Sequence, residues 1–221
     1  MIRVGIVDSG IDGAARARLV AVADFEPGAA TRELAVAALP PLRDRCGHGS
    51  RVAAIVAQAP AVELLDARVF FDTLSTSAAQ AAAAIEWSIA SGACVLNLSF
   101  GLREDRVALQ EACARAIAQG VVLVAATPAR GTAVFPASYA GVIRATGDAR
   151  CAPGEISWLD TAQADFGGHA RSLDGALAGA SAGCAWVCAA LASALGRTAN
   201  AAGALAALRD AAAYRGPERR T

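Results

Sequence analysis

Short apolar segments alternate along this chain with longer segments typical of helices, and this alternation constrains the fold more than any other feature. Residues 121–126 read VVLVAA, and residues 94–98 read CVLNL. Strands without a polar face are buried on both sides, which occurs mostly in parallel sheets that helices cover. The pattern therefore predicts an α/β domain with three layers, helix, sheet and helix, around a mostly parallel central sheet.

The predicted strands end at positions where polar or small residues follow. Asp8 comes after the first strand, and the segments SFG (99–101) and TPA (127–129) come after later ones. Ligand sites in such sheets lie at the carboxyl ends of the strands. We expect strands at 2–7, 62–70, 94–98, 121–126 and 142–146, and helices at 50–59, 76–91, 105–119, 180–195 and 199–213.

Length and composition narrow the class of protein. The chain has 221 residues, of which 55% are hydrophobic, which is enough for one domain with a large core. We assign residues 1–214 to this domain and residues 215–221 to a polar tail. Twenty basic and twenty acidic residues balance, which argues against a nucleic-acid partner. No uninterrupted apolar run is long enough to span a membrane.

The cysteines and the start of the chain point to a reducing compartment. None of the six cysteines forms a Cys-x-x-Cys pair, and no cluster of carboxylates suits calcium, so we expect neither a metal nor a cofactor. Met1 runs directly into a predicted strand without an export signal. These features predict reduced thiols and a cytoplasmic location.

Three residues that could together form a nucleophilic catalytic site lie in distinctive segments. Asp8 lies in VGIVDSGID (4–12), His48 lies between two glycines in GHGSRVA (47–53), and Ser181 opens a predicted helix. Taken alone, each also suits a structural role as a turn aspartate, a loop histidine or a helix N-cap. Together they can supply a nucleophile, its general base and the group that orients the base.

The order Asp, His, Ser and the residues around each resemble the subtilisin-like serine proteases, peptidase family S8. The resemblance continues between these motifs, in register, over nearly the whole chain. It is carried by IEWSIA (85–90), VLNLSFG (95–101), GVVLVAA (120–126), FPASY (135–139) and GVI (141–143). It implies a subtilisin-like fold and a serine endopeptidase that acts on a peptide or protein substrate.

The resemblance also implies a role for each site residue. Ser181 would attack the scissile carbonyl, His48 would move the proton, and Asp8 would orient the imidazole. An exposed strand edge would pair with an extended peptide, and the next strand would form a wall of the specificity pocket. The edge would consist of Ser99, Phe100 and Gly101, and the wall of Ala125, Ala126 and Thr127.

The chain departs from the family where the oxyanion should be held. The family's Ala-Ala-Gly-Asn becomes Ala126-Thr127-Pro128-Ala129, so Ala129 replaces the asparagine that donates a hydrogen bond to the oxyanion. The backbone N–H of Ser181, at a helix N-terminus, remains as a donor. Thr127, Arg130 or a protein partner are the alternatives for the missing donor. We therefore expect slow, selective hydrolysis, as in peptide maturation or processing.

Two other functions stay open on the sequence. The first is a catalytically impaired protein that binds extended peptides, or that acts only with an activating partner. The lost asparagine favours this function, and the presence of all three catalytic residues argues against it. The second is acyl transfer to an amine or alcohol through the same acyl-enzyme, for which no residue of the chain gives specific support.

Overall fold

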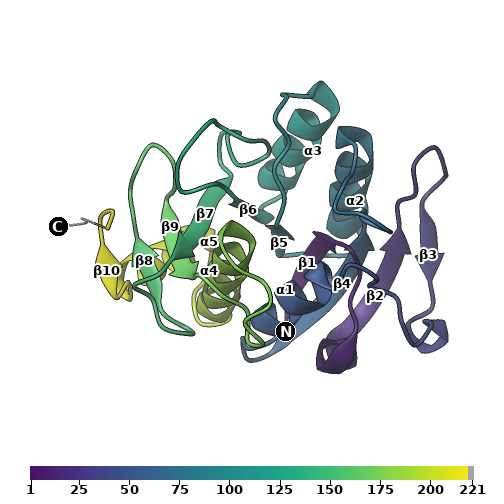
Figure 1. Ribbon diagram of the computed structural model, residues 1–221, viewed down its shortest axis with the longest axis horizontal. Coiled ribbons are helices and arrows are strands. Elements are labelled where there is room, and N and C mark those ends of the chain that lie inside the picture. The colour runs from purple at the N-terminus through teal and green to yellow at the C-terminus, as the bar shows by residue number, and fades with distance from the viewer. Residues whose placement is uncertain (219–221) are drawn as a thin grey trace.

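A single large sheet organises the protein. The computed structural model describes residues 1–218 (Figure 1). Its strands are β1 (Ile2–Asp8), β2 (Leu19–Asp24), β3 (Arg32–Leu34), β4 (Val62–Arg68), β5 (Val95–Leu98), β6 (Val122–Ala126), β7 (Ile143–Asp148), β8 (Ile156–Trp158), β9 (Phe166–His169) and β10 (Tyr214–Arg215). They form one sheet in the order β10-β8-β9-β7-β6-β5-β1-β4-β2-β3. All neighbours are parallel except β2–β3 and β8–β9, so the predicted mostly parallel sheet is confirmed.

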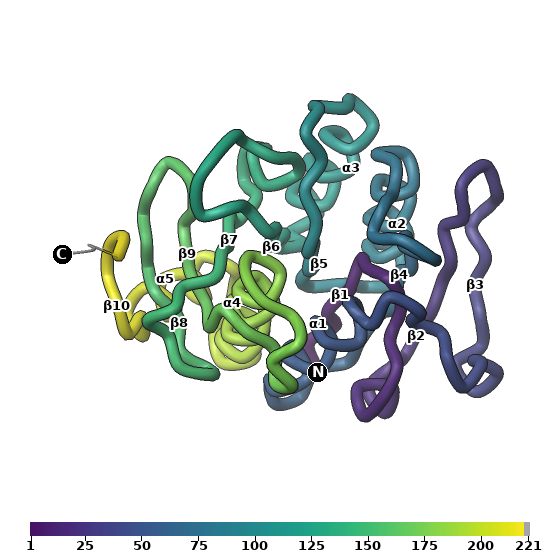
Figure 2. The backbone as a smooth tube through the Cα atoms, viewed as in Figure 1, coloured from purple at the N-terminus to yellow at the C-terminus, as the bar shows by residue number. Residues whose placement is uncertain are grey.

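Helices cover both faces of this sheet. The α-helices are α1 (His48–Val56), α2 (Ala78–Ala90), α3 (Val107–Ala118), α4 (Ala180–Leu195) and α5 (Ala201–Asp210), and two short 3₁₀ helices span Gly13–Arg18 and Val36–Ala38. Helices α1, α4 and α5 pack on one face, and α2 and α3 pack on the other (Figures 1 and 2). The predicted three-layer α/β architecture is therefore confirmed.

The central strands are buried on both sides because their side chains alternate between two cores. In β1, Val4 and Ile6 belong to the core under α1 and α4, whereas Val7 belongs to the core under α2 and α3. All three are fully buried. This arrangement explains why the sequence of such strands is apolar throughout rather than alternating.

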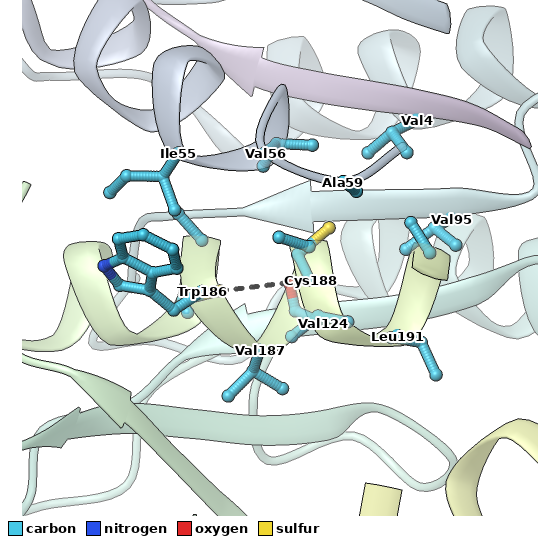
Figure 3. Close-up of a cluster of buried hydrophobic side chains, with 14 of the residues drawn as sticks. Val4, Ile55, Val56, Ala59, Val95, Val124, Trp186, Val187, Cys188 and Leu191 are labelled. Carbon is cyan, nitrogen blue, oxygen red and sulfur yellow. Dashed lines mark hydrogen bonds between the residues drawn. The ribbon is translucent and has the colours of Figure 1, made fainter. Parts of the chain in front are cut away.

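Helix α4 lies unusually close to the sheet, and this closeness fixes its N-terminal end. A Cβ on Gly183 would lie 2.0 Å from the carbonyl oxygen of Thr146 in β7, so only glycine fits there. Further along the helix, Cys188 and Leu191 pack among apolar side chains of the strands and of α1 (Figure 3). The first turn of α4, where Ser181 stands, is thus held rigidly over the carboxyl ends of the strands.

The structure also contains strands that the sequence pattern did not predict. These are β2, β3, β8, β9 and β10, of which β3, β8 and β10 have three residues or fewer, too short to show a period. In the expected tail, Arg215 pairs with Trp158 of β8, and residues 219–221 lie outside the described residues. The domain boundary at residue 214 stays a prediction. Within residues 1–218 no helix has the length and apolar character needed to cross a membrane.

Candidate active site

Asp8 ends β1 at the middle of the sheet, with β4 and β5 on either side. Its side chain is only 1% exposed. The backbone N–H of Ser9 donates to its Oδ1 at 2.8 Å, and the Ser9 hydroxyl donates to the same oxygen at 3.2 Å. The carboxylate is therefore held in one orientation at the carboxyl end of the strand.

His48 is the first residue of α1 and faces this carboxylate. Its Nδ1 lies 2.7 Å from Oδ1 and 2.8 Å from Oδ2 of Asp8. The glycines beside it make this approach feasible. Gly47 adopts φ +68°, and a Cβ on Gly49 would lie 2.4 Å from the carbonyl oxygen of Gly10. Burial by itself would lower the pKa of His48, but Asp8 outweighs it, and the pKa is raised.

Ser181 is the second residue of α4, so its backbone N–H has no partner within the helix. Its Oγ donates a hydrogen bond to the carbonyl oxygen of Ser99 at 3.1 Å. Ser181 and His48 line the same pocket of about 300 Å³. Among residues 1–218, no hydrogen bond joins these two side chains. His48 and Ser181 thus meet at one pocket, and the Ser181 hydroxyl points towards Ser99, the residue after β5.

The predicted substrate edge borders the same pocket, whereas the predicted wall does not. Ser99, Phe100 and Gly101 all line it. Phe100 and Gly101 have no backbone–backbone hydrogen bond within the described chain, so their N–H and C=O groups are free to pair with a peptide. Ala125 and Ala126 are buried in β6 without lining this pocket. Their assignment as a wall stays a prediction.

The candidates for an oxyanion donor lie around other cavities. The backbone N–H of Thr127 donates to the carbonyl oxygen of Ala145, and its side chain borders a separate cavity of about 540 Å³. Ala129 and Arg130 are exposed and line a third cavity of about 520 Å³. The pocket of Ser181 includes none of these three. Of the donors considered for the oxyanion, only the Ser181 N–H belongs to a residue that lines this pocket.

The described residues hold no group of three or more histidine, cysteine, aspartate or glutamate side chains suited to a metal ion. All six cysteines are free thiols. Cys46, two residues before His48, is partly buried, and burial and the nearby Asp44 raise its pKa.

Comparison with known proteins decides the family. The model of the subtilase family matches residues 1–214 of this chain. The chain belongs to the subtilase family. It is 30% identical over 154 residues to alkaline elastase YaB of Bacillus sp. (strain YaB), covering 64% of this chain and 38% of the elastase. It is 31% identical over 159 residues to subtilisin DY of Bacillus licheniformis, covering 64% of this chain and 54% of that protein. The matches thus span 38–54% of these relatives.

Solved structures of proteases share the fold of this subtilase. Sphericase superposes with a TM-score of 0.69 at 17% identity, covering 95% of this chain and 82% of its own. The protease domain of PatA, in a serine-to-alanine mutant, superposes with a TM-score of 0.64 at 19% identity and covers 95% of both chains. The prenylagaramide maturation protease PagA superposes with a TM-score of 0.60 at 21% identity, covering 88% of this chain and 75% of its own.

Some residues at the site of this subtilase were not predicted from its sequence. Phe70 and Leu74 line the pocket and make it partly apolar. Behind the site, Arg43 and Asp66 form a buried ion pair, with Arg43 Nε 2.6 Å from Asp66 Oδ2. A signal for Asp66 exists, because it interrupts the otherwise apolar run LLDA at residues 64–67. No local pattern marks Arg43 as buried, since it lies in a polar loop.

Proposed function

We propose that this subtilase is a serine endopeptidase whose catalytic triad is Asp8, His48 and Ser181. The observation that carries the proposal is the contact of His48 Nδ1 with both oxygens of Asp8, beside the pocket that Ser181 also lines. When Nδ1 donates its proton to Asp8, the lone pair of the imidazole resides on Nε2. That nitrogen is the general base of the proposed reaction.

The proposed reaction has two steps. The Ser181 hydroxyl gives up its hydrogen bond to the Ser99 carbonyl and attacks the carbonyl carbon of the scissile peptide bond. As it does so, its proton passes to Nε2 of His48. The imidazolium, which Asp8 stabilises, then gives this proton to the leaving amine as the C–N bond breaks. A water molecule, deprotonated by His48, attacks the resulting ester, and Ser181 recovers its proton.

The substrate is an extended peptide that pairs with the free backbone edge at Phe100 and Gly101. Its side chains meet an apolar surface, because Phe70 packs edge-to-face on Phe100 at 6.1 Å between ring centroids, and Leu74 and Leu102 line the same pocket. We therefore expect a preference for apolar residues near the cut. PagA is named as a maturation protease, and processing of a dedicated peptide is the proposed role by analogy of fold.

The rate of this hydrolysis is expected to be low. Ala129 has no side-chain donor, and the Thr127 N–H is engaged with Ala145. In a subtilisin, loss of the corresponding side-chain donor costs about 10²–10³-fold in turnover, about 3–4 kcal/mol. The remaining donor is the Ser181 N–H at the positive end of the α4 dipole. Activity that is reduced but measurable follows.

A second candidate function is peptide binding without turnover, or turnover only with an activating protein. The hydrogen bond from the Ser181 hydroxyl to the Ser99 carbonyl favours it, since the hydroxyl is not aligned with His48. Apo enzymes often show loose catalytic hydrogen bonds that tighten with substrate, so the triad remains the leading proposal.

Labelling with a fluorophosphonate probe, read by intact mass, tests the proposal. We expect one label on the native chain, none on Ser181→Ala, and faster labelling of Ala129→Asn. Ala133→Asn, on the same loop region, serves as the matched control and should label at the native rate. Absence of label on both the native chain and Ala129→Asn would refute an assembled triad. Label only on Ala129→Asn would favour the second candidate.

A further inference from the structure

Side-chain carboxylates shape the loop that precedes α1. Asp44 accepts hydrogen bonds from the backbone N–H groups of Gly47 and Ser50, at 2.7 and 2.8 Å, and from the Ser50 hydroxyl at 2.6 Å. Asp12 Oδ2 accepts from the N–H groups of Arg43 and Asp44, at 2.9 and 2.8 Å. The loop has no regular structure, so these contacts define its path.

Arg43 is the buried end of this loop. Its side chain is 1% exposed, and its guanidinium lies between two carboxylates, 2.6 Å from Asp66 and 2.6 Å from Asp24. Arg68 binds Asp24 at 2.8 Å and donates to the carbonyl oxygen of Arg43 at 3.0 Å. Arg32, which is mostly exposed, also binds Asp24, at 2.7 Å. Such buried ion pairs contribute little net stability, because removing the charges from water costs about as much as their attraction supplies.

Asp66 joins this loop to the turn that follows Asp8. Its Oδ2 accepts from Arg43 Nε at 2.6 Å and from the backbone N–H of Ile11 at 3.2 Å. Its Oδ1 is buried and has no hydrogen-bond partner within residues 1–218. One carboxylate oxygen therefore contacts both segments that carry the His48–Asp8 pair.

We propose that Asp66 and Arg43 are positioning residues for His48. Both side chains are buried and line no part of the pocket, so they act through the loop and the turn rather than on a substrate. Their ion pair sets the placement of the imidazole against Asp8. The inference rests on the proposed function, since that reaction requires a fixed His48.

The test is a variant that removes both charges together, Arg43→Met/Asp66→Leu. The variants are compared at about pH 8, where Asp66 is ionised because its pKa is about 6. One positive and one negative charge are then removed together, so a change at His48 reports on its position rather than on a change in net charge. Misplacement of a catalytic group by about 1 Å costs up to about 10²-fold. We expect kcat to fall at least about tenfold and KM to change less than about threefold, because the substrate edge does not touch this network.

The matched control removes a second, largely buried ion pair, that of Arg150 with Asp148. Asp148 in β7 is 5% exposed and binds Arg150 at 2.7 Å, with no contact to the loop before α1. Arg150→Met/Asp148→Leu should keep kcat within about twofold of the native value. An equal loss of kcat in this control would overturn the proposal, because the effect would then belong to any lost ion pair.

A second readout does not depend on hydrolysis. The chain has two histidines, so imidazole ¹⁵N labelling gives two sets of NMR signals. His169 Nδ1 lies 2.8 Å from the carbonyl oxygen of Cys151 and serves as an internal reference. We expect the Nδ1–H signal of His48 to broaden or vanish in Arg43→Met/Asp66→Leu while that of His169 stays. If the native chain hydrolyses no peptide but this change occurs, the proposed function fails and the positioning role stands.

Asp66→Asn provides a conservative variant in case the double variant does not fold. Asparagine keeps an oxygen for Arg43 and Ile11, so its kcat and His48 signal should lie between those of the native chain and of the double variant. The proposal would be overturned if Asp66→Asn, and Arg43→Met/Asp66→Leu where it folds, kept both the native His48 signal and the native kcat.

Discussion

Replacing Asp66 with asparagine should remove a measurable part of the pH dependence of folding stability. Asp66 is fully buried in β4, and burial raises its pKa to about 6 although Arg43 acts in the opposite direction. An aspartate in an unfolded chain has a pKa of about 3.9. The folded chain therefore binds this proton more tightly. Its stabilising contribution is present below about pH 4 and is lost as the pH rises through about 6.

The size of the effect follows from these two values. The full difference of about two pKa units corresponds to roughly 3 kcal/mol, of which about 1.4 kcal/mol develops between about pH 8 and pH 5. Urea unfolding followed by tryptophan fluorescence at both pH values measures it. On going from about pH 8 to pH 5, the native chain should gain roughly 1.4 kcal/mol more than Asp66→Asn, with equal m-values.

Asp148→Asn is the control for this measurement. Burial would raise the pKa of Asp148, but hydrogen bonds from Arg150 and Ser157 outweigh it and hold the pKa below its ordinary value. The stability that Asp148 contributes is lost only as the pH falls below about 4, so its variant should show no such difference between about pH 8 and pH 5. A pH-independent or reversed difference for Asp66→Asn would mean that Arg43 outweighs burial, and the reasoning would be refuted.

Three further predictions concern the site and its support. The acid limb of the pH profile of kcat/KM should lie above about pH 6.5, because Asp8 raises the pKa of His48 and only the neutral imidazole accepts the proton. An acid limb at or below about pH 6.5 would contradict this prediction. Asp8→Asn should lower kcat by about 10⁴-fold. Gly183→Ala should cost about 1–3 kcal/mol in thermal unfolding, whereas Gly196→Ala, whose Cβ would meet nothing closer than 3.6 Å, should not. Phe100→Ala should raise KM for peptides with apolar residues near the cut by about tenfold and leave labelling of small probes unchanged. An equal KM for the native chain and this variant would argue against substrate binding to the apolar surface of the pocket.

The fold was largely predictable because its central strands and its helices carry local signals. The helix at 180–195 was predicted with the bounds that the structure has. Strand β9 was missed because its sequence, FGGH, has no strand-forming pattern. It is a strand because it pairs with β7 and β8. Its glycines fit the close approach of α4, since a Cβ on Gly168 would lie 2.6 Å from the carbonyl oxygen of Gly183. Such pairing and packing come from distant segments and leave no local periodicity.

The candidate site was also predictable only in part. Asp8, His48 and Ser181 stand beside glycines or at element ends, where local sequence indicates a special backbone. In the structure His48 and Ser181 line one pocket, and the buried Asp8 contacts His48. The partnership of Arg43 with Asp66 could not be predicted, because it depends on which strands are neighbours and on the path of an irregular loop.

The order of the site along the chain has a consequence for the timing of synthesis. Asp8 and His48 emerge from the ribosome early, whereas α4, which carries Ser181, emerges only after β1 to β9 and packs onto α1 and the middle of the sheet. The sheet order also places β1 between β4 and β5, so its contacts are with later segments and closure of the domain is slow. During translation the nascent chain therefore holds Asp8 and His48 before Ser181 is present. The proposed ability to cut peptides arises only when α4 has docked on the sheet.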